Sequence, residues 1–255
     1  MLELIDVAKS FGPTRALAPL SLDIQSRRTT VLIGPSGCGK STLIGLMNGL
    51  IRPDQGSVLF DSTAVTAANS ALIRRRMGYV IQDGGLFPHL DAGANVTLMA
   101  RHIGWPKAKV EARLEELADL TRFPKDALAR YPVQLSGGQC QRVSLMRGLM
   151  LDPEILLLDE PLGALDPMIR AELQTDLKAV FEALNKTVVL VTHDIGEAGF
   201  FADVIVLMRE GAIVQTGTLR DLVDAPADPF VTRFINAQRA PFDALRVDAS
   251  RGGAP

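Results

Sequence analysis

The chain has 255 residues, of which 47% are hydrophobic and 22% charged, and its formal net charge at pH 7 is −2. This is the composition of an ordinary globular protein, and it excludes the strongly basic surface of many nucleic-acid-binding proteins and a polybasic membrane anchor. Two cysteines, Cys38 and Cys140, are too few for a disulfide scaffold. No signal peptide is expected, and no apolar run approaches the roughly 18 to 20 residues that span a bilayer. We therefore expect a soluble, cytoplasmic chain that reaches a membrane only through partners.

Short apolar or alternating runs dominate the first sixty residues and predict β-strands. They are Leu2–Val7, Leu20–Ile24, Val31–Ile33 and Ser57–Phe60. A glycine-rich loop follows the third run, and a helix is expected to begin near Lys40. From about residue 86 to residue 150 the pattern becomes helical. In Lys107–Leu120 the apolar residues recur at the spacing of one helical face, at Val110, Leu114, Leu117 and Ala118.

Strand-like runs return after residue 150, each preceded by a helical segment. They are ILLLD at 155–159, TVVLV at 187–191 and VIVLM at 204–208. Strands that alternate with helices predict an α/β fold with a mostly parallel sheet. Beyond about Thr218 prolines interrupt the chain, and residues 250–255 are expected to be disordered.

The glycine-rich loop, GPSGCGKS at Gly34–Ser41, has the G-x-x-x-x-G-K-[ST] pattern of a phosphate-binding loop. Its glycines let backbone N–H groups turn toward phosphates, and the N-terminus of the following helix adds a favourable dipole. Lys40 is expected to reach the β- and γ-phosphates of ATP, and the Ser41 hydroxyl to bind Mg²⁺. Because the loop directly follows an apolar strand, an ordinary glycine turn is the weaker interpretation. The expected nucleotide contacts here are Gly34, Pro35, Ser36, Gly37, Cys38, Gly39, Lys40, Ser41 and Thr42.

An apolar strand, ILLLDE at Ile155–Glu160, ends in two adjacent carboxylates. In parallel sheets, ligands bind at the carboxyl ends of the strands. Asp159 is therefore expected to hold Mg²⁺, directly or through water, and Glu160 to act as the general base for the attacking water. Alone, this pattern also fits a strand that runs into an acidic loop. Together with the phosphate-binding loop it predicts a nucleotide-hydrolysing site.

A second candidate phosphate-binding segment, LSGGQ at Leu135–Gln139, precedes a helical pattern. Its Ser-Gly-Gly offers a hydroxyl group, close backbone approach and a helix N-terminus. Two such segments would be redundant around one nucleotide within one chain. Both are needed if each completes the other's site across a two-fold dimer.

These segments, followed by ALD at Ala164–Asp166 and THD at Thr192–Asp194, occur in the order found in ABC transporter ATPase subunits. The chain resembles this family over about residues 1–235. The resemblance implies a homodimer in the ATP-bound state, with Mg²⁺ as the cofactor of ATP. Two ATP molecules would then lie between the loop of one subunit and four residues of the other, Ser136, Gly137, Gly138 and Gln139. ATP would favour the closed pair, and hydrolysis would release it.

The resemblance also implies roles for four further residues. Phe11 resembles the aromatic residue that stacks on adenine, although an early Phe is more often part of the core. Gln82 resembles the Q-loop glutamine, which meets Mg²⁺ and senses the membrane subunit. Asp166 resembles the D-loop aspartate that crosses the dimer interface to the partner's site. His193 resembles the switch histidine at the γ-phosphate, which would act in catalysis with Glu160, Lys40 and Gln82.

A single set of motifs without membrane helices favours the separate ATPase subunit of an importer, peripheral at the cytoplasmic face of the inner (plasma) membrane. Residues 74–90, 103–105 and 130–139 resemble the osmoprotectant group, which imports quaternary amines such as glycine betaine, choline or carnitine. The implied partners are two transmembrane permease subunits and, indirectly, a substrate-binding protein, but no nucleic acid. Three alternatives stay open: an importer for another small solute, a soluble ABC ATPase that acts on a macromolecule, and a non-hydrolysing ATP-gated module. Intact Glu160 and His193 disfavour the last.

The family implies how the chain is divided. Residues 1–235 are expected to form one ABC ATPase domain, with a RecA-like P-loop core at about 1–85 and 151–218. An N-terminal antiparallel β subdomain and an α-helical subdomain at about 86–150 would complete it. Residues 219–255 form a short tail, for which no regulatory domain is expected.

Cys140 departs from the pattern of the resembled family, and Cys38 suggests a hypothesis about oxidation. The LSGGQ segment at Leu135–Gln139, which we call the signature, continues as LSGGQCQRV, with Cys140 where many members of the osmoprotectant group have glutamine. Cys38 is expected at a helix N-terminus, where thiols tend toward thiolate, so its oxidation could block nucleotide binding. A small residue that the loop tolerates is the simpler alternative.

Overall fold

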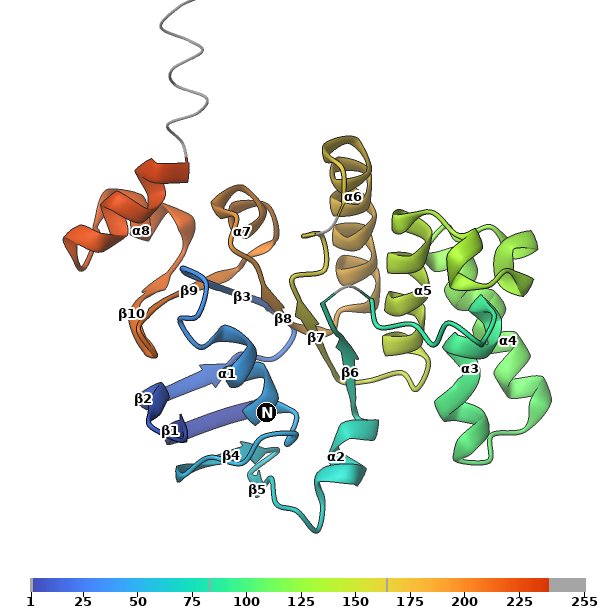
Figure 1. The fold of residues 1–255 in the computed structure, drawn as a ribbon, viewed down its shortest axis with the longest axis horizontal. Coiled ribbons are helices and arrows are strands. Elements are labelled where there is room, and N and C mark those ends of the chain that lie inside the picture. Colours follow the sequence, from blue (N-terminus) through green and yellow to red (C-terminus); the bar gives the residue numbers. More distant parts are fainter. Residues whose placement is uncertain (1, 83, 164, 239–255) are drawn as a thin grey trace, which may run out of the picture.

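A six-stranded sheet forms the centre of the molecule (Figure 1). The structure, a computed structural model, describes residues 2–82, 84–163 and 165–238. The strand order is β10-β9-β3-β8-β7-β6, and every neighbouring pair is parallel except β9 and β10. The strands are β3 (Thr29–Ile33), β6 (Met77–Val80), β7 (Ile155–Asp159), β8 (Thr187–Val191), β9 (Val204–Arg209) and β10 (Ala212–Gly217). β3, β7 and β8 are buried along their whole length, as expected for parallel strands that are covered on both faces.

A second, antiparallel sheet lies beside the first and has the strand order β2-β1-β4-β5. Its strands are β1 (Leu2–Phe11), β2 (Thr14–Ile24), β4 (Gln55–Phe60) and β5 (Thr63–Ala64). Helix α1 (Lys40–Met47) contacts both sheets, through β1 and β2 on one side and β7 on the other. The helix that follows the glycine-rich loop is therefore held between two layers.

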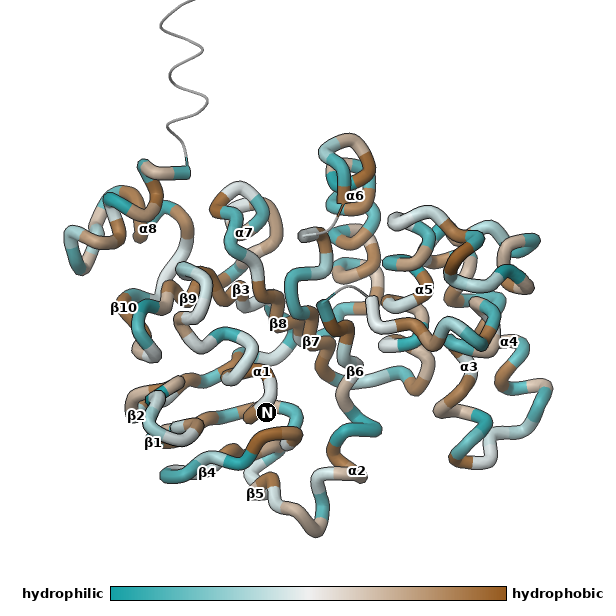
Figure 2. The backbone as a smooth tube through the Cα atoms, viewed as in Figure 1, coloured by the Kyte–Doolittle hydropathy of each residue, from teal (hydrophilic) through white to brown (hydrophobic). Residues whose placement is uncertain are grey.

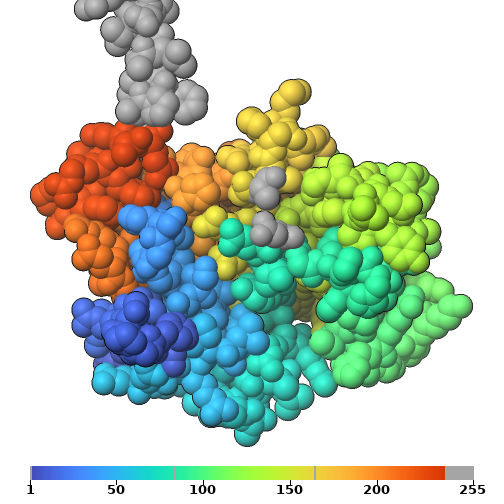
Figure 3. Space-filling model, viewed as in Figure 1, coloured from blue at the N-terminus to red at the C-terminus, as the bar shows by residue number. Residues whose placement is uncertain are grey.

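A run of helices is inserted between β6 and β7. It contains α3 (Ala92–His102), α4 (Lys107–Leu120), the short 3₁₀ helices η1 (Lys125–Ala129) and η2 (Pro132–Gln134), and α5 (Gly137–Leu149). Helix α5 packs on β6 and so joins the insertion to the edge of the sheet. In the space-filling view, this insertion (green) and the antiparallel sheet (blue) occupy opposite sides of one face (Figure 3).

The remaining helices are α2 (Ser70–Arg75), α6 (Pro167–Leu184), α7 (Ile195–Phe201) and α8 (Leu219–Asp224), and residues 229–238 are also helical. Helices α6 and α7 cover the face of the six-stranded sheet that points away from the antiparallel sheet. Among the described residues, no helix combines the length and the apolar character that crossing a membrane requires.

Two hydrophobic cores follow from the alternation of side chains along the central strands. Leu156 and Leu158 point into the core beneath α5, α6 and α7. Ile155 and Leu157, from the same strand, point into the core between the two sheets. The brown strands at the centre of Figure 2 are therefore apolar on both faces, which is why the sequence shows continuous apolar runs rather than alternation.

The structure confirms the predicted fold class: an α/β core with a mostly parallel sheet, an antiparallel β region and inserted helices. The predicted helix at Lys107–Leu120 matches α4, and α1 begins at Lys40 as expected. The prediction for β2 was wrong at its start, because the strand begins at Thr14 rather than Leu20. Its first two residues, Thr14 and Arg15, are polar and exposed, and they pair with Phe11 and Ser10 of β1 across a tight turn at Gly12. Ala164 and the tail residues 239–255 of the predictions lie outside the described residues.

Candidate active site

The glycine-rich loop connects β3 to α1 at the carboxyl edge of the parallel sheet. Gly34 and Gly39 have positive φ values of 146° and 104°, which favour glycine. A Cβ atom at Gly34 would lie 2.2 Å from the Met208 carbonyl oxygen, and one at Gly39 would lie 2.8 Å from that of Ala16. The loop is thus closely packed against neighbouring backbone, and other residues at these two positions would force it open.

The Lys40 ammonium group lies inside the curl of this loop. Its Nζ atom donates hydrogen bonds to the carbonyl oxygens of Gly34 (2.8 Å) and Pro35 (3.1 Å). Lys40 is also the first residue of α1, so its charge adds to the positive end of the helix dipole. A buried ammonium group and a helix N-terminus within one glycine-rich loop make a site for a polyanion such as a chain of phosphates.

Ser41 and Asp159 bring a hydroxyl and a carboxylate together beside the loop. Ser41 Oγ donates a hydrogen bond of 3.3 Å to Asp159 Oδ1, which links the start of α1 to the end of β7. Burial raises the pKa of Asp159, the Ser41 hydrogen bond lowers it, and the neighbouring Glu160 carboxylate raises it again. Hard oxygen donors of this kind suit Mg²⁺, which typically takes one or two protein ligands and completes its shell with phosphate oxygens and water. Among the described residues, no group of three or more His, Cys, Asp or Glu side chains forms a fuller metal cage.

Glu160 and His193 form the second pair of the site. His193 Nδ1 lies 3.3 Å from Glu160 Oε2, and the two residues follow the ends of the adjacent strands β7 and β8. Glu160 has a φ of 45°, and its backbone N–H donates to the Val191 carbonyl at 3.0 Å. This strained turn directs a half-buried carboxylate toward an exposed imidazole, in reach of an incoming water molecule.

Two residues that sequence reasoning missed hold the turn around His193. Buried Glu197 accepts a hydrogen bond of 2.5 Å from Thr192 Oγ1, and burial raises the pKa of Glu197. Gln238 Oε1 accepts a hydrogen bond of 2.6 Å from the Ile195 backbone N–H, at the first turn of α7. Asp194, the N-cap of α7, satisfies the next N–H groups. The only sequence signal for any of these was the Asp-x-x-Glu spacing around a helix start.

Gln82, the residue expected to act as the Q-loop glutamine, is exposed and lies two residues after the end of β6, the neighbour of β7. Two residues after it, the backbone is held by α5. Ser144 Oγ donates to the Gly84 carbonyl (2.9 Å), and Arg147 donates to the carbonyls of Gly84 and Gly85 (both 2.8 Å). Sequence reasoning missed Ser144 and Arg147, because nothing local to α5 marks them as partners of a loop some 60 residues earlier.

The signature segment forms the N-terminus of α5. Ser136 Oγ accepts from the Gln139 N–H (3.2 Å), and Gln139 Oε1 accepts from the Ser136 N–H (3.0 Å), which makes a capping box. Asp166 caps α6 in a similar way, with Oδ1 accepting from Met168 and Ile169. Phe11 lies at the end of β1 with its ring half exposed. Among the hydrogen bonds and ion pairs of the described residues, none joins Phe11, Gln82, Ser136 or Asp166 to the cluster around Lys40 and Glu160.

The thiol hypothesis for Cys38 was wrong about its electrostatics. Cys38 is 3% exposed, and burial raises the pKa of its thiol. The nearby Lys40 charge and hydrogen bonds lower the pKa but do not outweigh burial. Burial therefore outweighs the nearby positive charge, which favours the simpler alternative of a small buried residue in the loop.

A family model described as ABC transporter matches residues 17–163. The chain is 42% identical to the glycine betaine/carnitine/choline transport ATP-binding protein OpuCA of Bacillus subtilis, over 94% of this chain and 63% of that protein. It is 42% identical to the glycine betaine uptake system ATP-binding protein YehX of Escherichia coli, over 92% of this chain and 76% of that protein. It is 43% identical to the sulfate/thiosulfate import ATP-binding protein CysA of Thermosynechococcus vestitus, over 94% of this chain and 70% of that protein.

A solved structure has the same fold, the dimeric post-hydrolysis state of the ATP-binding cassette MJ0796 bound to ADP and Pi. Its TM-score is 0.78 at 32% identity, over 86% of this chain and 99% of that one. The chain thus spans less than two thirds of the length of OpuCA and nearly the whole of a single cassette. On this evidence the chain belongs to the ABC transporter family.

Proposed function

We propose that this chain is the ATP-hydrolysing subunit of an ABC importer. The observation that carries the proposal is the joining of five side chains at one sheet edge. Lys40 lies in the phosphate-binding loop, Ser41 contacts Asp159, and Glu160 contacts His193. These five residues come from three separate parts of the chain, and together they supply what phosphoryl transfer to water needs.

ATP binding would use the loop and its lysine. The backbone N–H groups of residues 34–42 and the Lys40 ammonium group would hold the phosphates, and the exposed ring of Phe11 would stack on adenine. Ser41 and Asp159, with Gln82, would hold Mg²⁺, which when bound neutralises phosphate charge and fixes the phosphates in one orientation. The contact between Ser41 Oγ and Asp159 Oδ1 supports this assignment, because it already places two suitable oxygen donors side by side.

Hydrolysis would use the pair at the strand ends. Glu160 would accept a proton from the attacking water while the water oxygen forms a bond to the γ-phosphorus. The bond between the γ-phosphorus and the β–γ bridging oxygen would break, and ADP would leave. His193, 3.3 Å from the Glu160 carboxylate, would orient that carboxylate and contact the γ-phosphate. Lys40 would stabilise the charge on the transferred group.

A homodimer would complete the site. Ser136, Gly137, Gly138 and Gln139 of a second copy, together with its Asp166, would contact the nucleotide that the first copy binds. The dimeric state of the similar cassette bound to ADP and Pi supports this arrangement. Residues 1–235 would act as one ATPase domain, divided at about residues 85, 151 and 218 as the sequence predicts.

The proposed solute is a quaternary-amine osmoprotectant such as glycine betaine, choline or carnitine. Similarity to OpuCA and YehX supports it, while the equal similarity to CysA favours a second candidate, an importer for another small solute. The subunit would sit at the cytoplasmic face of the inner membrane, bound to two permease subunits that receive solute from a substrate-binding protein.

The test is transport by the assembled complex. The chain would be reconstituted with candidate permease and binding subunits in proteoliposomes, with ATP inside and radiolabelled glycine betaine or sulfate outside. We expect uptake of glycine betaine that requires ATP and is lost in Glu160→Gln. Uptake of sulfate without uptake of glycine betaine would overturn the osmoprotectant assignment in favour of an importer for another small solute. ATP hydrolysis without uptake of either, stimulated by a soluble macromolecule, would overturn the importer assignment.

A further inference from the structure

Helices α5 and α6 run side by side in the same direction, and each begins at a residue of the proposed partner-facing surface. Ser136 caps α5 and Asp166 caps α6. The two helices approach closely at the signature glycines, since a Cβ atom at Gly138 would lie 2.8 Å from Ile169 Cγ2. The glycines of the signature therefore have a packing role within the subunit in addition to any contact with phosphate.

A buried ion pair joins the two helices further along. Arg142 Nη1 lies 2.7 Å from Asp176 Oδ2, and Arg142 Nη2 donates to Glu172 Oε1 at 2.8 Å. Arg142 and Asp176 are 9% and 7% exposed at their side chains, so both charges are removed from water. Arg142 and Glu172 each lie six residues beyond their helix cap, about 9 Å along the axis.

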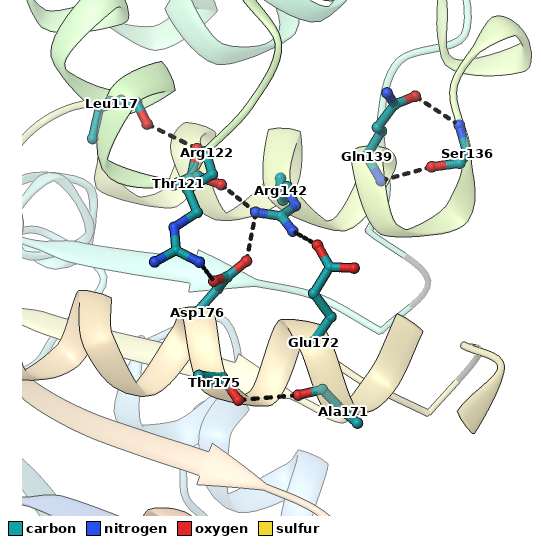
Figure 4. A network of polar contacts seen from close by, with 10 residues as sticks. All are labelled: Leu117, Thr121, Arg122, Ser136, Gln139, Arg142, Ala171, Glu172, Thr175 and Asp176. Atoms are coloured by element: carbon teal, nitrogen blue, oxygen red, sulfur yellow. Dashed lines mark hydrogen bonds and ion pairs between the residues drawn. The ribbon is translucent and has the colours of Figure 1, made fainter. Parts of the chain in front are cut away.

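The end of α4 completes this network (Figure 4). Arg142 Nη1 also donates to the Thr121 carbonyl at 2.6 Å, and Arg122 Nη1 donates to Asp176 Oδ1 at 2.8 Å. Figure 4 shows the Arg142 guanidinium between the C-terminus of α4 and the face of α6. Two helices of the insertion are thus tied to one helix of the core at a single buried carboxylate.

Such a network orients helices more than it stabilises the fold. The desolvation of two buried charges offsets most of their mutual attraction, so a buried ion pair adds little net stability compared with apolar residues of the same size. The network does fix the orientation of the helices, because the guanidinium group donates its hydrogen bonds only in its own plane. Asp176 Oδ2 has the Arg142 charge beside it but no well-aligned hydrogen bond, and the hydrogen bond of Arg142 Nη1 goes to Thr121.

We propose that Arg142 and Asp176 are positioning residues that set the orientation of α5 against α6. They would thereby hold Ser136 and Asp166 as one unit that faces the nucleotide of the partner subunit. The proposal rests on the proposed function, a dimeric ATPase whose sites are completed by the second copy. It adds that the insertion and the core cannot rotate past each other at this point without breaking the pair.

The first test measures orientation in the free monomer, so it does not depend on the proposed function. Val133 and Met168 flank the two helix caps and are 91% and 84% exposed. Spin labels at Val133→Cys and Met168→Cys, with both native cysteines replaced by alanine, report the distance between the caps. We expect a narrow distribution that becomes at least about twofold broader in Asp176→Asn. The control is Arg113→Met, which removes a partly buried arginine whose hydrogen bonds and ion pairs, within the described part of the chain, go to Leu149, Glu116 and Asp152 and not to α6.

The second test measures turnover and ATP-dependent dimerisation. Asp176→Asn should lower kcat and dimer formation by at least about tenfold, with nucleotide affinity of the monomer within about threefold of wild type. The double variant Arg142→Met/Asp176→Leu removes both charges and should recover thermal stability but not kcat. Glu172→Gln, at a more exposed position, should lower kcat by about threefold. This variant replaces Asp176→Asn in both tests if Asp176→Asn does not fold.

Three results would overturn the proposal. One is an unchanged distance distribution in Asp176→Asn or, if that variant is unfolded, in Glu172→Gln. Another is a kcat that returns with stability in the double variant, which would show a role in stability alone. The third is an Arg113→Met control that broadens as much as Asp176→Asn. If wild type neither binds ATP nor dimerises, the proposed function fails instead, and the distance measurement still decides the positioning role.

Discussion

His193 Nδ1 lies 3.3 Å from Glu160 Oε2, although the two residues are 33 positions apart in the sequence. The contact forms because β7 and β8 are adjacent parallel strands in register, with Asp159 opposite Val191. Each residue comes shortly after its strand end, so the sheet itself sets their separation. We therefore expect the carboxylate and the imidazole to act as one unit.

Replacing Glu160 with glutamine should abolish turnover while ATP still binds. The amide keeps the shape of the side chain but cannot accept the proton of the attacking water, so kcat should fall by about 10² to 10⁴-fold. Phosphate release measures the loss, and fluorescent-nucleotide titration measures binding. Glu182→Gln, at an exposed position on α6, is the matched control and should keep wild-type activity. Near-normal hydrolysis by Glu160→Gln would show that Glu160 is not the general base.

Replacing Asp159 with asparagine should stabilise the nucleotide-free protein while it lowers turnover. Burial raises the pKa of Asp159 above the ordinary 3.8, so at neutral pH the folded state bears the cost of a buried charge that asparagine lacks. We expect a gain of about 1 kcal/mol in the free energy of unfolding at pH 7.5, or about 2–4 °C in Tm.

The pH dependence of the Asp159→Asn variant gives the sharper check. As the pH falls below the raised folded-state pKa, the wild-type carboxyl takes up a proton in the folded state, so the stability difference between the two proteins should shrink and disappear below the ordinary pKa of 3.8. Thermal unfolding at a series of pH values from about 3.5 to 7.5 measures this. Asp126→Asn, at a surface ion pair with Arg130, is the control and should change little. A lower Tm for Asp159→Asn at pH 7.5 would contradict the assignment of burial as the dominant influence.

Cys38 should react slowly with iodoacetamide. Burial raises the pKa of both thiols, but Cys38 is 3% exposed and Cys140 is only partly buried, so we expect the rate of Cys38 at pH 7.5 to be at least about tenfold below that of Cys140. The rate should keep rising beyond pH 9 rather than level off near neutrality. Single-cysteine variants resolve the two thiols, and both should react alike in guanidinium chloride. A plateau below pH 8 would show that Cys38 is a thiolate after all.

The sequence predicted the parts of the site that are local in the chain. The phosphate-binding loop could be found because its chemistry needs glycines and a lysine at fixed short spacings, and α4 because its apolar face repeats over fourteen residues. The family resemblance then supplied roles for isolated residues such as His193. The carboxyl-edge rule for parallel sheets predicts that Asp159 lies beside the loop, and its 3.3 Å contact with Ser41 places it there.

The sequence could not predict contacts that depend on tertiary packing. Arg142 and Asp176 are 34 residues apart, and neither position has a local pattern that distinguishes it from a solvated charge on a helix. Arg147 looks like a surface residue until α5 packs against the loop at Gly84 and Gly85. The pKa of Cys38 was predicted in the wrong direction because the helix dipole is visible in the sequence, whereas burial is not.

Gln238 should support the turn that carries His193, from a helical segment far along the chain. Its side-chain oxygen accepts the Ile195 N–H at 2.6 Å, and Val231 and Ile235 anchor the same segment in the core. Gln238→Ala removes this acceptor at a helix start, where similar losses cost about 0.5–2 kcal/mol, and should also lower kcat severalfold without a change in ATP binding.

A conservative variant separates this role from simple packing. Gln238→Glu keeps an acceptor oxygen and places a negative charge near the N-terminus of α7, so it should restore both Tm and kcat to about wild-type values. Asn236→Ala, exposed on the same segment, is the control and should behave as wild type. Wild-type kcat and Tm in Gln238→Ala would mean that the hydrogen bond has no role. A glutamate variant as impaired as the alanine variant would point to the shape of the glutamine side chain rather than to its acceptor.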